Sequence, residues 1–180
     1  DLSNFDTRKV RQFGGMFDGC RSLTDLDISS FDTSNATSLE MMFRECASLP
    51  SIDVTHFDTS KVVNMGSIFQ GCEEVEELDL SSFDTHNVEN CSMLFTYDYK
   101  LTTIYVDPVK WDLTDADRNS NYDMFQSDYD LIGQNGTEYT DEESHDKEYA
   151  IIDNAASNPG YLTDVAYKGI THSVTYPDGS

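Results

Sequence analysis

Residues 31–46 have the sequence FDTSNATSLEMMFREC, and their first three residues, Phe31-Asp32-Thr33, recur along the chain. The same triplet begins at residues 5, 57 and 83, so four copies follow one another with a period of 26 residues. An altered fifth copy, Trp111-Asp112-Leu113, begins 28 residues after the fourth. Self-similarity at a fixed period of this length indicates a repeat architecture, in which each copy forms one unit that stacks on its neighbours.

A short stretch of alternating apolar and polar residues precedes each triplet. The apolar pairs at equivalent positions are Leu26 and Ile28, Ile52 and Val54, and Leu78 and Leu80. Alternation with a period of two residues predicts a short strand with one buried face. Strands from successive copies are expected to lie side by side in a parallel sheet.

The residues after each triplet change to a helical spacing. In the second copy the apolar residues recur at intervals of three and four, at Ala36, Leu39, Met42, Phe43 and Cys46. This spacing predicts one short helix in each copy. With Asp32 as the N-cap, Phe31 and Ala36 take the N′ and N4 positions of a hydrophobic staple, so the triplet suits a helix start.

Together these patterns predict an α/β fold: a leucine-rich-repeat-like solenoid with one short strand and one short helix in each coil. Residues 1–131 are expected to hold about five coils, the fifth degenerate, with a C-terminal capping segment at 132–165. Residues 166–180 are expected to form a strand-like tail or the start of a following domain. Residues that recur in phase are expected to form ladders through the stack; they are Phe5, Phe31, Phe57, Phe83, Asp32, Asp58, Asp84, Cys20, Cys46 and Cys72.

The second copy also resembles a known repeat. The run from Phe31 to Asn35, with Met42-Phe43, Cys46 and Leu49 in phase, resembles the repeat of BspA-like leucine-rich-repeat bacterial surface proteins. Related repeats occur in mycoplasma-type surface lipoproteins. The resemblance implies an exported, surface-displayed and non-catalytic binding module.

The chain is strongly acidic, because 34 Asp and Glu residues against 11 Lys and Arg give a formal net charge of −23. This charge argues against nucleic-acid binding and against docking to an anionic membrane. No stretch approaches the roughly 18 apolar residues of a membrane span. A basic partner or divalent cations remain compatible, and self-repulsion favours a monomer. Since the chain begins within a strand and no cap covers its first coil, we expect a fragment of a longer protein or a mature chain whose N-terminal part has been removed. The resemblance implies that this protein is exported.

The four cysteines do not suggest a disulfide framework. Cys20, Cys46 and Cys72 share one repeat position and are expected to form a buried column of thiols, whereas Cys91 lies out of phase. No Cys-x-x-Cys spacing occurs and no His falls in phase with the cysteines, so zinc is not expected.

The main candidate for binding is the outward face of the predicted strands. Its residues alternate with the buried ones; they are Asp25, Asp27, Asp53, Glu77, Asp79 and Tyr105. The exposed face of a stacked sheet is a surface that solenoids commonly use for binding. An acidic stripe of this kind suits a basic protein patch or cations, and the alternative is a face that is merely solvated.

Other chemistry has little support in the sequence. The cluster Glu142, Glu143, His145 and Asp146 contains metal-ligand residue types, but a single His in an acidic loop is usually just solvent-exposed. The repeated Asp side chains are explained by capping, so calcium is not required. No Gly-rich phosphate loop, nucleophile elbow or His-Glu-x-x-His motif occurs, and no enzyme, cofactor or metal is expected.

The resemblance therefore implies a non-catalytic adhesion module on the outside of a bacterial cell. We expect it to recognise a host or neighbouring-cell protein or glycan through its strand face. The alternative is a structural spacer that displays another domain, with or without calcium as a stabiliser.

Overall fold

The computed structural model describes residues 2–114, 116, 122–139, 147–153 and 160–169. Its regular elements are the strands β1 (Glu77–Asp79), β2 (Thr103–Val106) and β3 (Leu162–Asp164) and the 3₁₀ helices η2 (Lys147–Tyr149) and η4 (Val165–Tyr167). The strands form one parallel sheet in the order β1-β2-β3, in which Tyr105 of β2 lies opposite both Asp79 and Thr163. Of the tail expected at 166–180, only residues 166–169 are described.

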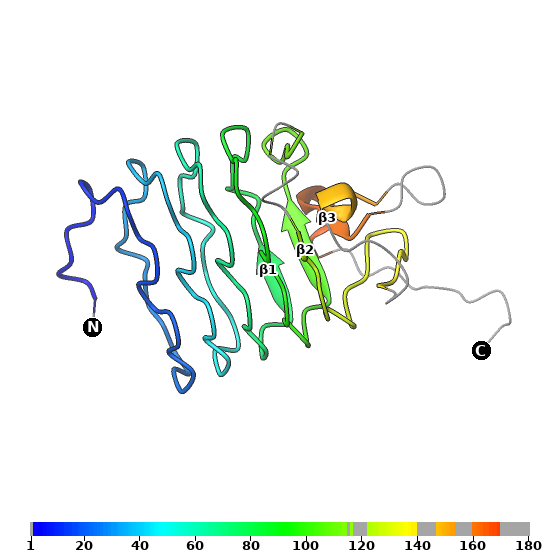
Figure 1. Ribbon diagram of the computed structural model, residues 1–180, viewed down its shortest axis with the longest axis horizontal. Helices are drawn as coiled ribbons and strands as arrows, with labels where there is room; N and C mark the ends of the chain where they lie inside the picture. The colour runs from blue at the N-terminus through cyan, green and yellow to red at the C-terminus, as the bar shows by residue number, and fades with distance from the viewer. Residues whose placement is uncertain (1, 115, 117–121, 140–146, 154–159, 170–180) are drawn as a thin grey trace, which may run out of the picture.

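From its start to β2, the chain winds in successive turns that lie side by side (Figure 1). Each turn, called a coil below, holds one copy of the repeat. Isolated parallel bridges join equivalent positions of the first four coils, Gln12 with Ser38, Ser38 with Asn64, and Asn64 with Asn90. Because bridged residues are 26 positions apart, the sequence period is the step from one coil to the next.

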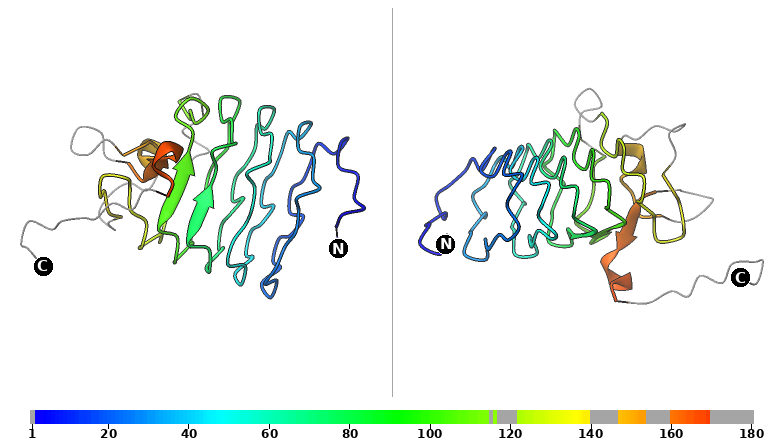
Figure 2. Two further views of the ribbon diagram at one scale, coloured as in Figure 1. Left: turned by 180° about the vertical axis from the view of Figure 1, so that it is seen from behind. Right: turned by 90° about the horizontal axis from the view of Figure 1, so that it is seen from below.

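Figure 2 shows the coils from two further sides. The apolar side chains form one continuous core along them. A column of phenylalanine rings runs through this core. The ring centroids are 5.8 Å apart for Phe17 and Phe43, 5.9 Å for Phe43 and Phe69, 6.0 Å for Phe69 and Phe95, and 5.4 Å for Phe95 and Phe125. Phe43, Phe69 and Phe95 therefore each pack between the rings of the coils before and after them.

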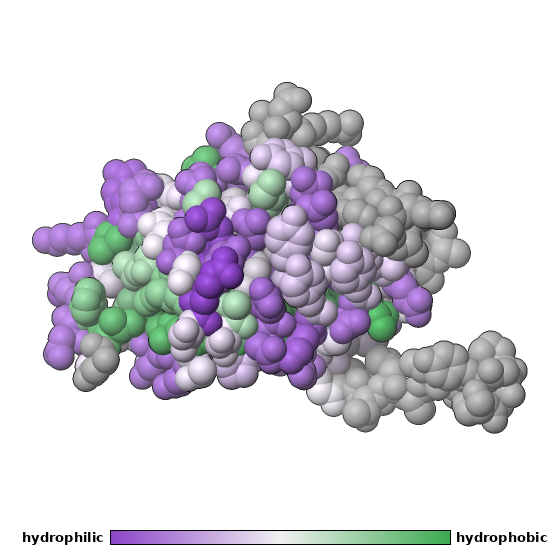
Figure 3. Space-filling view, turned by 60° about the horizontal axis from the view of Figure 1, so that its bottom comes forward, coloured by the Kyte–Doolittle hydropathy of each residue, from purple (hydrophilic) through white to green (hydrophobic). Residues whose placement is uncertain are grey.

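The phenylalanines of the triplets show how burial depends on neighbours. Phe31, Phe57 and Phe83 are at most 4% exposed, whereas Phe5 of the first coil is 57% exposed. Figure 3 shows apolar side chains gathered near the end where the chain starts. In the structure the first coil contacts a neighbouring coil on one side, and its Phe5 and Met16 stay open to solvent, whereas its Phe13 is buried.

The stretches expected to be helices form successive tight turns instead. In the second coil, Leu39, Phe43 and Glu45 each donate their backbone N–H to a carbonyl of the next coil, at 2.9, 3.0 and 2.7 Å. The N–H groups between them close turns within the coil, as Cys46 does to the carbonyl of Phe43 at 3.1 Å. Met41 and Glu45 adopt φ values of 57° and 59°, which no α-helix contains. The bonds to neighbouring coils take donors that an α-helix would need, so the expected helix does not form.

The Asp of each triplet caps one of these turns. Asp32 Oδ1 accepts the backbone N–H of Ser34 at 2.9 Å, and Asp58 Oδ1 accepts that of Ser60 at 3.0 Å. A carboxylate that bonds the backbone two residues further on forms an Asx turn. The bonds from the Ser34 hydroxyl and backbone lower the pKa of Asp32 below its ordinary value. The Asp carboxylate thus accepts a bond from a backbone N–H at the start of a turn. The sequence predicted this role at the start of a helix.

The cysteines that share a repeat position stack in the core. Cys46 and Cys72 are buried and Cys20 is half-buried, and all four cysteines of the chain are reduced thiols. The thiol of Cys46 donates to the carbonyl of Phe17 at 3.3 Å, and that of Cys72 donates to the carbonyl of Phe43 at the same distance. Burial raises the pKa of Cys46 to about 12, so this thiol stays protonated at physiological pH.

Residues after the fifth coil close the core at its far end. The indole N–H of Trp111 donates to the carbonyl of Ala150 at 2.9 Å. The buried ring of Tyr161 stacks on Tyr149 with centroids 4.9 Å apart and meets Phe125 edge to face at 5.2 Å. These aromatic contacts extend the phenylalanine column into the C-terminal segment.

Candidate binding surface

The polar residues of the candidate face point outward between buried ones. In β1 and β2, Leu78, Ile104 and Val106 are buried, while Glu77 is exposed and Tyr105 is half-buried. The same alternation continues in the earlier coils. We call the outward set the acidic strand face; it consists of Asp25, Asp27, Asp53, Glu77, Asp79 and Tyr105, of which Asp25, Asp27 and Asp53 are exposed and Asp79 is half-buried.

Three carboxylates of this face are held in the same way. The Oδ1 atoms of Asp27, Asp53 and Asp79 accept the backbone N–H two residues further on, at 3.0, 3.1 and 3.0 Å. For Asp27 and Asp53 a hydroxyl adds a second bond, from Ser29 at 2.6 Å and from Thr55 at 2.7 Å. These bonds lower the pKa of Asp27 and Asp53, so both carboxylates carry a negative charge at neutral pH.

A lysine already occupies one end of the acidic strand face. The ammonium of Lys168, which follows η4, lies 2.5 Å from Asp79 Oδ2 and 5.6 Å from the centroid of the Tyr105 ring. Burial raises the pKa of Asp79, but the bonds from Lys168 and Ser81 outweigh it and the pKa lies below its ordinary value. Asp79 and Tyr105 therefore hold the ammonium of Lys168 by an ion pair and a cation–π contact.

Sequence reasoning did not find Lys168. It is 89 positions away from Asp79, and no local pattern connects the two residues. The contact depends on β3, which pairs with β2; Lys168, which follows η4, reaches across β2 to Asp79 of β1.

Another pair of carboxyl groups is buried in the core. Asp98 takes the repeat position of Cys20, Cys46 and Cys72, and its Oδ1 accepts the backbone N–H of Cys72 at 2.8 Å. Asp98 in turn donates its own N–H to Asp128 Oδ1 at 3.1 Å. Among the described residues no donor reaches the Oδ2 atom of either group.

The environment of this pair favours its neutral form. Burial, followed by the neighbouring Asp128, raises the pKa of Asp98 well above its ordinary value, and burial raises that of Asp128. Both side chains are at most 1% exposed, so no substrate reaches them in this conformation.

The described residues contain neither a metal-ligand cluster nor a candidate membrane span. Within the described ranges, no group of three or more His, Cys, Asp and Glu side chains is arranged to hold a metal ion. The cluster Glu142, Glu143, His145 and Asp146 lies outside those ranges. In the described part of the chain, no helix has the length and apolar character needed to cross a membrane.

The part of the chain that forms the coils matches a known protein family. Residues 1–52 and 25–139 match the family described as "Mycoplasma protein of unknown function, DUF285", and the chain belongs to this family. The overlapping matches cover the coils that contain the triplets, and they agree with the mycoplasma-type repeat that the motif predicts. No curated protein and no solved structure gave a match.

Proposed function

We propose that this chain is a non-catalytic binding module of an exported bacterial surface protein, and that it captures a basic partner protein on its acidic strand face. The observation that carries the proposal is Lys168. Lys168, which is distant in sequence, contacts both Asp79 and the ring of Tyr105. This contact supports the proposal because it places a cationic side chain on the face.

The rest of the face offers similar groups. Asp27 and Asp53 are exposed, and their Asx turns use Oδ1, as the turn of Asp79 does. In Asp79 the other oxygen, Oδ2, bonds the lysine. The repeat therefore presents acceptors of the same kind at equivalent positions, and a basic segment lying across the coils would meet them in turn.

We further propose that the coils form a leucine-rich-repeat-like solenoid of the BspA-like kind. The parallel bridges at a step of 26 residues, the continuous core and the parallel strands support this assignment. The resemblance of the motif to surface proteins supports display outside the cell, and family membership supports the mycoplasma-type repeat.

The test is direct binding of a lysine-rich peptide, followed by a screen of basic host matrix proteins. The variant Asp27→Lys/Asp53→Lys is compared with Glu89→Lys/Asp130→Lys, which makes the same change in net charge at exposed residues outside the face. We expect the first variant to lose about tenfold in affinity, corresponding to about 1.4 kcal/mol, and the control to lose far less.

Equal losses in both variants would reduce the interaction to general charge attraction and refute a site on this face. No binding to the peptide or to any basic protein would favour the structural spacer. A melting temperature that rises with calcium and falls with chelator would instead support a calcium-stabilised scaffold.

A further inference from the structure

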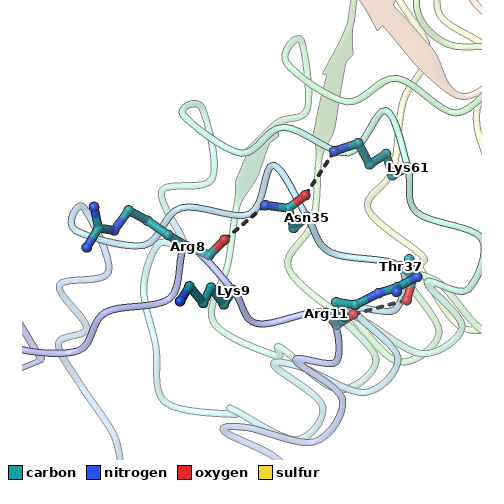
Figure 4. Close-up of a pocket in the computed structure, with 6 residues that line it drawn as sticks. All are labelled: Arg8, Lys9, Arg11, Asn35, Thr37 and Lys61. Carbon is teal, nitrogen blue, oxygen red and sulfur yellow. Dashed lines mark hydrogen bonds between the residues drawn. The ribbon is translucent and has the colours of Figure 1, made fainter.

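A pocket on the first three coils differs in charge from the rest of the chain. It has a volume of about 430 Å³ and is lined by Arg8, Lys9, Arg11, Asn35, Thr37 and Lys61; Figure 4 shows these side chains. We call it the basic pocket. Four of the eleven Lys and Arg residues of the chain gather here, in a protein with a formal net charge of −23. Such a local reversal of charge favours an anionic ligand.

The repeat builds one wall of this pocket. Lys9, Asn35 and Lys61 occupy the same repeat position in successive coils. The amide of Asn35 donates to the carbonyl of Arg8 at 2.9 Å, and the ammonium of Lys61 donates to Asn35 Oδ1 at 3.0 Å. Asn35 thus links the first and third coils through its own side chain, and its bond to Lys61 holds that ammonium at the pocket.

Arg11 and Thr37 form the adjoining wall. The backbone N–H of Thr37 donates to the carbonyl of Arg11 at 2.8 Å, and the Thr37 hydroxyl donates to the same carbonyl at 3.2 Å. The side chain of Gln12 in turn donates to that hydroxyl at 2.9 Å. Neutral amide and hydroxyl groups are therefore interleaved with the cations at fixed positions.

The cations of the pocket differ in how many hydrogen-bond donors they can offer to a ligand. Arg8 is held by Asp6 through two bonds of 2.8 Å, and its guanidinium points away from Asn35 (Figure 4). Lys61 uses two bonds, to Asn35 and to the carbonyl of Ser34 at 2.8 Å, out of three possible donors. Lys9 and Arg11 are exposed. We therefore assign the ligand contacts to Lys9, Arg11 and Lys61.

We propose that the basic pocket binds an acidic saccharide, a sugar unit that carries a sulfate or carboxylate group. A pocket of this volume holds a small ligand. The three cations suit its negative group. Asn35 uses one of its two amide N–H donors and Thr37 one of its two hydroxyl lone pairs in the bonds above, so the second donor and the second lone pair suit its ring hydroxyls. A long polyanion such as DNA would extend beyond the pocket onto the acidic surface, where it is repelled. This site is separate from the acidic strand face, and the proposal does not depend on it.

The experiment titrates the full chain with a sulfated uronate-containing disaccharide, the unsulfated neutral disaccharide and inorganic sulfate, and follows backbone amide shifts. We expect the sulfated disaccharide to shift the amides of Asn35 and Thr37 and to bind at least about tenfold more tightly than either comparator. We expect Lys9→Gln/Arg11→Gln to lose most of this affinity. The matched control Arg21→Gln/Lys100→Gln removes two exposed positive charges outside the pocket and should bind as the unmodified protein does.

Several results would overturn the proposal. Equal affinity for inorganic sulfate would make the pocket a simple anion site, and equal affinity for the neutral disaccharide would remove the role of charge. Equal losses in the two variants would indicate diffuse electrostatic attraction. Because the shifts of Asn35 and Thr37 are measured in the unmodified protein, their absence would refute the site even if a variant failed to fold.

Discussion

The hydroxyl of Thr33 both donates to and accepts from the backbone of Asp58 in the next coil. It donates to the Asp58 carbonyl at 3.0 Å and accepts the Asp58 N–H at 2.8 Å. The same two-way contact joins Thr7 to Asp32, Thr59 to Asp84 and Thr85 to Asp112. The threonine of each of these four triplets therefore bonds its coil to the next.

Removing one of these hydroxyls should weaken the stack. Thr59→Val keeps the shape of the fully buried side chain but leaves the N–H and carbonyl of Asp84 without this partner. We expect the free energy of unfolding in urea to fall by about 2 kcal/mol, because unsatisfied polar groups are costly in a core. Thr55→Val removes an exposed hydroxyl bonded to Asp53 and should change stability by less than about 1 kcal/mol. Equal effects would contradict the special role of the triplet threonine.

The phenylalanine column should tolerate truncation least in its middle. Phe69 is fully buried between Phe43 and Phe95, so Phe69→Ala should lower the free energy of unfolding by about 3–5 kcal/mol. Phe5 is 57% exposed, and Phe5→Ala should change stability by about 1 kcal/mol or less. Thermal and urea unfolding of both variants tests this comparison, and a small effect at Phe69 would show that the column does not carry the core.

The buried pair Asp98 and Asp128 should make the protein less stable as the pH rises from acid toward neutral. Both groups have raised pKa values in the folded state. Below the ordinary carboxyl pKa of about 4, both groups are protonated whether the chain is folded or unfolded, and their contribution is fully present. Above it, the unfolded chain releases protons that the folded chain retains, so stability is lost until the folded-state pKa is passed.

The variant Asp98→Asn isolates this effect. Subtracting its pH profile of unfolding free energy from that of the unmodified protein removes the opposite contribution of exposed carboxylates with lowered pKa values, such as Asp27 and Asp53. We expect the variant to gain relative stability as pH rises above about 4. Asp130→Asn changes an exposed carboxyl and serves as the control. A difference profile that is flat with pH would show that the buried pair does not titrate in this way.

Removing the side chain of Lys168 should free Asp79 and the ring of Tyr105 for a basic partner. If this lysine occupies a site for a basic partner, Lys168→Ala should raise the affinity for a lysine-rich peptide about threefold, since a partly exposed ion pair contributes about 0.2–1 kcal/mol. Lys100→Ala removes a lysine paired with Glu74 outside the face and should leave affinity nearly unchanged. Lower affinity in the Lys168 variant would mean that the lysine organises the face instead of competing for it.

The sequence by itself determined the repeated features of this protein. The period of 26 residues, the apolar positions and the recurrence of the triplet follow from the order of residues alone, because equivalent positions of stacked coils meet the same environment. Phe31, Phe57 and Phe83 illustrate this, since their common position in the repeat is a buried position in the structure. The alternation at Glu77, Leu78 and Asp79 likewise corresponds to an exposed, a buried and a half-buried side chain.

The tertiary structure decided how the coils bond to one another and which residues outside the repeat pattern contact each other. Apolar residues spaced three and four apart fit both a helix and a row of turns. Because Leu39 and Phe43 donate their backbone N–H groups to the next coil, the stretch forms turns. Lys168 meets Asp79, and Lys61 meets Asn35, through pairing between segments that are distant in sequence or one coil apart. A local pattern specifies which face of a segment is buried, whereas contacts between segments exist only once the coils have stacked.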